Sequence, residues 1–152
     1  PAPTPARDTL LTQATWELLW LILHHPEYGD QLSETIDYEW INTKSTTGKL
    51  LSRLLAELRE GMIDSVDQIE NIIDSVEERQ LLADIHSREL SVEEPTKQIV
   101  FCLERLRRKF VEGQIKKLEQ KIINSDPETQ IRLMRERKEI LRKVAHPLEL
   151  AL

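Results

Sequence analysis

Four histidines are the first residues of this chain whose type could support metal chemistry. His24 and His25 are adjacent, so on a helix their side chains point about 100° apart and cannot share a metal ion. The other two, His86 and His146, lie in other segments, and no HExxH or Glu-x-x-His spacing is present. We therefore predict no metal site, and we interpret His24 and His25 as helix-end residues that interact with the helix dipole.

The single cysteine, Cys102, could in principle act as a nucleophile. One cysteine excludes an intramolecular disulfide and a cysteine-rich zinc cluster. It lies in the apolar stretch IVFCLERL, and no histidine or aspartate stands out as an activating partner. We expect Cys102 to be buried and to pack as a small hydrophobic residue. Because the many acidic residues are scattered, with no isolated acid/base pair, the sequence argues against an enzyme and predicts no cofactor.

The stretch TKSTTGKLL invites comparison with a phosphate-binding loop, because Gly48–Lys49 falls at a predicted helix start. That motif needs glycine at position 43 and Ser or Thr at position 50, where this chain has Thr43 and Leu50. No strand pattern precedes the stretch. We interpret it as an ordinary helix N-terminus.

The elements that must position these residues are predicted to be helices. The chain has 152 residues, enough for one domain with a real core, and only four glycines. Leu, Ile, Glu, Arg and Lys dominate the composition, which favours helices over sheets. No strand pattern and no internal repeat is convincing.

The densest apolar run, WELLWLILHHPEY, predicts a helix from about Thr9 to His25 that other helices surround. The run is too short for a membrane span, which needs roughly 20 apolar residues, so we predict no membrane segment. Pro26 is expected to stop this helix or to start a second one, from Glu27 to about Ile36.

Further helices follow from periodicity and capping signals. Leucines from position 50 to position 58 predict an amphipathic helix from Thr46 or Thr47 that Gly61 ends. Ser65 with Gln68, and Ser75 with Glu78, are possible capping boxes of two more helices.

The C-terminal third predicts a helical hairpin. One helix is expected from about Pro95 to Asn124, which is roughly 45 Å long, with Gly113 as a possible bend. The sequence NSDPE then predicts a tight turn in which Asp126 caps a last helix to about Ala145 and Pro127 takes its first position.

The predicted fold is therefore all-α: a compact helical bundle, then a long helix and a protruding C-terminal antiparallel hairpin. We divide the chain into a Pro-rich linker (1–8), a bundle (9–112), the hairpin (113–145) and a tail (146–152). Because the chain starts with Pro1 and PAPTPAR is typical of a linker, we expect it to be a piece of a longer protein.

The charge is divided unevenly between the two parts. Residues 1–103 hold 8 Lys and Arg against 19 Asp and Glu, a net charge of −11, whereas residues 104–152 hold 13 against 8, a net charge of +5. Such a basic appendage is typical of partner or nucleic-acid binding, although a solvated helix surface is an alternative.

Nucleic-acid binding is the less favoured of the two functions, because acidic residues interrupt the basic ones and no aromatic residue follows Phe110. A protein partner that receives apolar anchors in a groove fits better. The alternative is that these anchors only hold the hairpin together. The predicted partner-binding residues are Leu118, Ile122, Ile131, Arg132, Met134, Arg135, Lys138 and Leu141.

WELLWLILHHPEY resembles the opening helix of the C-terminal helicase-binding domain of bacterial DnaG-type DNA primase. The closing stretch CLERLRRKFVEGQIKKLEQKIINSDPETQIRLMRERKEILRK resembles the terminal hairpin of the same family. The resemblance spans roughly residues 9–145 and rests on patterns rather than on fixed residues.

The resemblance implies a non-catalytic domain that binds the N-terminal collar of the replicative hexameric helicase, recruits primase to the replication fork and modulates the helicase. Primer synthesis would belong to absent upstream domains. It implies a cytoplasmic protein, and we expect a monomer in isolation with weak or no nucleic-acid binding. The related N-terminal domain of the helicase is an alternative, but a helicase should continue into a linker helix, whereas this chain ends after AHPLELAL.

Overall fold

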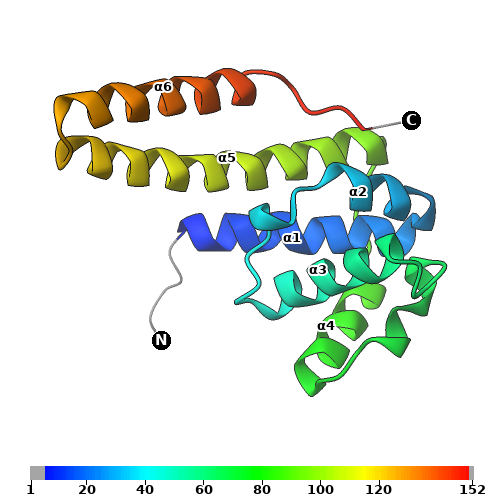
Figure 1. The fold of residues 1–152 in the computed structure, drawn as a ribbon. Coiled ribbons are helices and arrows are strands. Elements are labelled where there is room, and N and C mark those ends of the chain that lie inside the picture. Colours follow the sequence, from blue (N-terminus) through cyan, green and yellow to red (C-terminus); the bar gives the residue numbers. More distant parts are fainter. Residues whose placement is uncertain (1–5, 151–152) are drawn as a thin grey trace.

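The computed structural model describes the backbone of residues 6–150 and the side chains of residues 13–150. The regular elements of this part are all helices, and it has no strand, so the all-α prediction is confirmed for it (Figure 1). The elements are α1 (Ala6–His24), η1 (Pro26–Tyr28), α2 (Gly29–Thr35), η2 (Tyr38–Trp40), α3 (Thr46–Arg59), η3 (Val66–Asn71), α4 (Val76–Ser87), α5 (Pro95–Ile123) and α6 (Pro127–Val144).

Helix α1 is the central element, with α3, α4 and α5 packed around it (Figure 1). Leu18, Leu19, Leu21 and Ile22 are fully buried, and Trp20 is nearly so. A helix that is apolar on most of its sides must be covered on most of its sides, so the prediction of a surrounded helix is confirmed. The helix begins at Ala6, inside the predicted 1–8 linker, whose first five residues lie outside the described part.

The predicted second helix is only partly correct. Residues Pro26–Tyr28 form a 3-10 turn, and the α-helix begins at Gly29 and ends at Thr35. Pro26 cannot donate a backbone hydrogen bond, so it suits the first position of this new turn rather than a continuation of α1.

Helix α3 begins with a cap and a glycine that the cap requires. The Ser45 hydroxyl accepts a hydrogen bond of 3.0 Å from the Gly48 N–H. A Cβ atom at Gly48 would stand 1.9 Å from the carbonyl oxygen of Asn42, so only glycine fits there. The glycine of the TTGK sequence therefore has a structural cause. Gly61, with φ of +74°, ends the region of α3 as predicted.

Capping also sets the boundaries of η3 and α4. The Ser75 hydroxyl accepts from the Glu78 N–H at 3.1 Å, while the Glu78 carboxylate accepts from the Asp74 N–H at 3.1 Å. The predicted cap at Ser75 is thus present, although Glu78 reaches the residue before the cap. Ser65 instead caps a 3-10 helix, through the N–H of Asp67.

Helix α5 belongs to two parts of the molecule. Its first half packs on α1, and α6 lies antiparallel along its second half (Figure 1). It is continuous through Gly113, where an added Cβ would meet no atom within 4 Å. Asp126 caps α6 by accepting from the Thr129 N–H at 2.8 Å, and Pro127 occupies the first turn, as predicted.

The segment after α6 returns to the bundle (Figure 1). Arg107 donates to the carbonyl oxygen of His146 at 2.9 Å, and the Glu104 carboxylate accepts from the Leu148 N–H at 3.3 Å. Leu148 packs against the core, and Leu150 is a buried member of it. The described part of the predicted 146–152 tail is therefore packed on the bundle.

Candidate interaction surface on the terminal hairpin

One face of α6 carries exposed apolar residues spaced along its length. Ile131, Met134 and Leu141 are 54%, 58% and 43% exposed, and Lys138 lies between them. The steps of three and four residues place all four on one side of a helix. We call these four residues the outer stripe. Apolar side chains gathered on one exposed helix face are typical of a protein-binding surface.

Positive charges accompany the outer stripe. Arg135 and Lys138 are exposed and form no ion pair with any residue whose side chain is described. Arg142 is instead paired with Glu139, and this hydrogen-bonded pair lowers the pKa of Glu139 and raises that of Arg142. The outer stripe therefore combines three apolar anchors with the cation of Lys138, and the cation of Arg135 lies beside it.

Leu118, one of the predicted partner-binding residues, does not belong to this exposed surface. It is only 8% exposed, and Leu133 of α6 is 6% exposed. Both lie on the sides that α5 and α6 turn toward each other, so they hold the hairpin together. Ile122 is half-buried, and its carbonyl oxygen accepts from the Gln130 side chain at 2.7 Å. Leu118, Leu133 and Ile122 therefore pack within the hairpin, as the alternative interpretation expects, whereas the apolar residues of the outer stripe do not.

Arg132, another predicted contact residue, is exposed but lies on a different side of α6 from the outer stripe. It lines a surface groove of about 720 Å³ at the tip of the hairpin, which we call the tip groove. Lys117 and Lys121 of α5 line the same groove. The predicted set of eight residues is therefore divided among the hairpin interior, the outer stripe with Arg135, and this groove.

The two histidines at the end of α1 contact aromatic rings and backbone. The His24 ring stacks on Trp20 with centroids 4.1 Å apart, and its Nδ1 lies 3.0 Å from the Trp20 carbonyl oxygen. His86 approaches from α4, with its ring centroid 6.4 Å from that of His24. Within residues 13–150, no three His, Cys, Asp or Glu side chains are placed to hold a metal ion.

Cys102 is fully buried, as predicted, but it has a polar partner that the sequence did not indicate. Its thiol donates to Glu17 Oε2 at 3.3 Å, and Gln98 donates to the same oxygen at 2.9 Å. Burial, followed by the interaction with Glu17, raises the pKa of the thiol to about 12. A protonated thiol is a poor nucleophile, so this cluster is suited to joining α1 to α5 rather than to chemistry.

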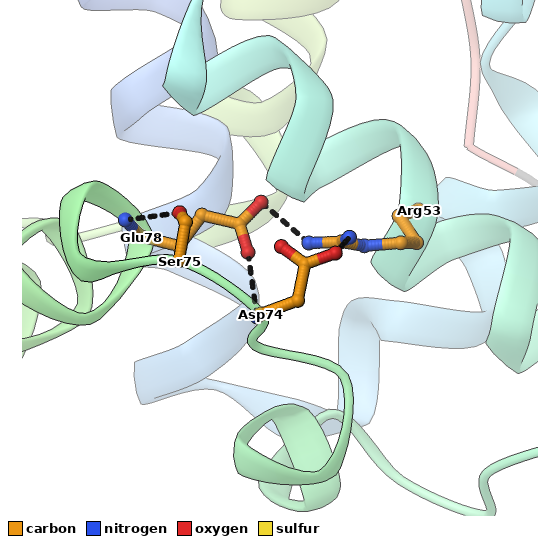
Figure 2. Close-up of polar contacts among 4 residues, drawn as sticks. All are labelled: Arg53, Asp74, Ser75 and Glu78. Carbon is orange, nitrogen blue, oxygen red and sulfur yellow. Dashed lines mark hydrogen bonds and ion pairs between the residues drawn. The ribbon is translucent and has the colours of Figure 1, made fainter.

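A second polar cluster joins α3 to α4 (Figure 2). Arg53 donates to Asp74 at 2.7 Å and also to the buried carboxylate of Glu78. Hydrogen bonding to Glu78 raises the pKa of Arg53, and hydrogen bonds to Glu78 and Arg53 lower that of Asp74. The Ser75 cap was visible in the sequence, but Arg53 was not, because 25 residues separate it from Glu78.

Two findings limit the functional interpretation. No helix in the described part of the chain combines the length and the apolar character that crossing a membrane requires. Comparison of the chain with protein-family models, curated proteins and solved structures finds no significant match. The functional interpretation therefore depends on the surfaces described above and on the resemblance of the sequence patterns.

Proposed function

We propose that this chain is a non-catalytic protein-interaction domain that docks on the N-terminal collar of a replicative hexameric helicase. In this proposal it is the helicase-binding part of a DnaG-type primase in the cytoplasm, where it recruits primase to the replication fork and modulates the helicase. The resemblance of the opening run and of the closing hairpin supports this identity. The outer stripe is the single observation that carries the docking function.

The architecture of the hairpin supports such a role. The buried first half of α5, with Ile99, Leu103 and Leu106 in the core, anchors the hairpin in the bundle. Leu118 and Leu133 then hold α6 against α5. The outer stripe is consequently presented on a supported helix, which costs less conformational entropy on binding than a flexible segment would.

Docking by the outer stripe follows the helix-in-groove pattern of recognition. Ile131, Met134 and Leu141 would enter an apolar groove of the helicase collar, while Arg135 and Lys138 would meet acidic groups at its edge. Burial of the three apolar side chains supplies the affinity, since apolar area removed from water is stabilising. The domain is expected to be monomeric in isolation, with weak or no binding to nucleic acid.

The test is a titration of the N-terminal domain of the replicative helicase from the same organism with this chain by calorimetry. Met134→Glu places a charge in the outer stripe and should weaken binding by at least about tenfold, because the carboxylate must lose its water. Val76→Glu is the matched control, since Val76 is also exposed but lies at the start of α4.

Equal affinity of the Met134→Glu and wild-type chains would contradict docking through the outer stripe. Absence of any binding by the wild-type chain would contradict the helicase as partner. Point variants are preferable to deletion of the hairpin, because a truncation that removes α6 also removes Leu150 from the bundle core.

A further inference from the structure

The tip groove combines several positive charges with one apolar lining residue. It opens between the end of α5 and the start of α6, where Lys117, Lys121 and Arg132 are among its lining residues. Glu136 is the one carboxylate that lines it. Leu133, buried between the two helices, supplies apolar surface. Three cations against one carboxylate leave an excess of two positive charges.

Three other grooves of the described chain do not share this excess. Two cations and three carboxylates line the groove beside Arg53, and one lysine and two glutamates line the groove beside Phe101. Two arginines and one glutamate line the groove beside the C-terminal segment. The tip groove is therefore the most positive of the four, on a chain whose net charge is −6.

The charges of the tip groove are largely available to a ligand. Lys117 and Lys121 are exposed and form no ion pair with any described side chain. Arg132 is exposed and interacts electrostatically with Asp126 at the cap of α6. An exposed cation without a fixed partner loses little when it binds an anion, because it gives up water rather than an existing ion pair.

The tip groove is also separate from the outer stripe. With about 100° per residue, Arg132 and Glu136 lie about 100° and 140° around α6 from Ile131. Met134 and Leu141 lie about 60° and 80° from Ile131 in the opposite direction. A partner in the tip groove would therefore contact a different face of the hairpin.

We propose that the tip groove binds an acidic segment of a partner protein. Its carboxylates pair with Lys117, Lys121 and Arg132, and one apolar side chain packs against Leu133. Nucleic acid fits less well, because no aromatic residue lines the groove to stack a base. A long polyanion would also be repelled by the bundle, where residues 1–103 carry a net charge of −11. A short acidic segment stays within the positive field of the hairpin.

The probe is a short fluorescent peptide of Glu and Asp residues around one Leu, and its anisotropy is followed as the whole chain is added. Saturable binding is expected that weakens steeply between about 50 and about 300 mM salt, because screening acts on exposed charges. The double variant Lys117→Glu with Lys121→Glu should lower the affinity by at least about tenfold.

The matched control is Lys44→Glu with Lys116→Glu, which changes the net charge by the same amount. Lys44 lies in the loop before α3, and Lys116 is exposed on α5 but does not line the groove. This control should lower the affinity by less than about threefold, since only the long-range field changes.

Absence of saturable binding, or an equal loss in both double variants, overturns the proposal. Tighter binding of a single-stranded oligonucleotide than of the peptide overturns it in favour of nucleic acid. Self-association of the chain in sedimentation, reversed by Lys117→Glu with Lys121→Glu, overturns it in favour of a second copy. None of these measurements involves a helicase, so the result is independent of the outer stripe.

Discussion

At the residue scale, identical residue types have opposite roles because their surroundings differ. Gly48 and Gly113 both lie within α-helices, where glycine is normally unfavourable. An added Cβ at Gly48 would collide with the Asn42 carbonyl oxygen, whereas at Gly113 it would meet nothing within 4 Å. Only the first glycine is therefore required by the fold.

Alanine substitutions at these two glycines should therefore change the stability of the chain in opposite directions. Gly48→Ala should destabilise the chain by about 2 kcal/mol, because the loop at Asn42 must move to relieve the clash. Gly113→Ala should stabilise it by about 0.5 to 1 kcal/mol through helix propensity alone. Urea unfolding followed by circular dichroism measures both, and a gain in stability from Gly48→Ala would contradict the close approach.

At the element scale, features set by residues close together in the sequence could be predicted. Contacts between residues far apart in the sequence could not. Ser75, Asp126 and the apolar run of α1 were predictable, because caps and helix periodicity depend on neighbours within about four residues. The ion pair of Arg53 with Glu78 was not, since it depends on how α3 packs against α4.

The same limit applies to the candidate site. Both Leu118 and Met134 are apolar residues of a predicted hairpin, and the sequence does not give the rotation of α5 against α6. The structure buries Leu118 and exposes Met134. The sequence thus indicated two last helices rich in apolar and basic residues, but it did not indicate how those residues are divided between the interior, the outer stripe and the tip groove.

Substitution of Arg53 tests whether its ion pair with Glu78 holds α3 against α4. Arg53→Met should destabilise the chain by about 2 kcal/mol at pH 7, because the buried Glu78 carboxylate loses its cation. The figure is at the low end for a broken pair, since Arg53 is itself about a third exposed. Urea titrations of both chains give the difference, and Arg79→Met, at an exposed arginine of α4, is the control.

The contribution of Asp74 to this cluster depends on pH in a defined direction. Its pKa is lowered from the ordinary 3.8 in the folded chain, so it stabilises the fold fully above pH 3.8. That contribution is lost as the pH falls below 3.8 and through the lowered folded pKa. Asp74→Asn should therefore destabilise the chain at pH 7, and the difference from wild type should shrink at about pH 3. A constant difference in stability between the two pH values would contradict this linkage.

At the scale of the whole molecule, the C-terminal segment after α6 packs back against α5 and the bundle core. Arg107 and Glu104 of α5 form hydrogen bonds with the segment after α6. Leu150 of that segment is part of the hydrophobic core that surrounds α1. The hairpin is therefore attached to the bundle at both ends: through the continuous α5 and through this returning segment. We infer that the hairpin and the bundle unfold as one cooperative unit.

Leu150→Ala tests this closure. Removal of a buried leucine side chain should destabilise the whole chain by about 2 kcal/mol, whereas Leu90→Ala, at an exposed leucine, should cost less than about 0.5 kcal/mol. Hydrogen exchange gives the decisive readout. In the Leu150→Ala chain, protection should fall by a similar factor at the core of α1 and at the inner face of α6, because both exchange through global unfolding. Loss of protection confined to α6 would instead show that the hairpin opens independently of the bundle, and would contradict the cooperative closure.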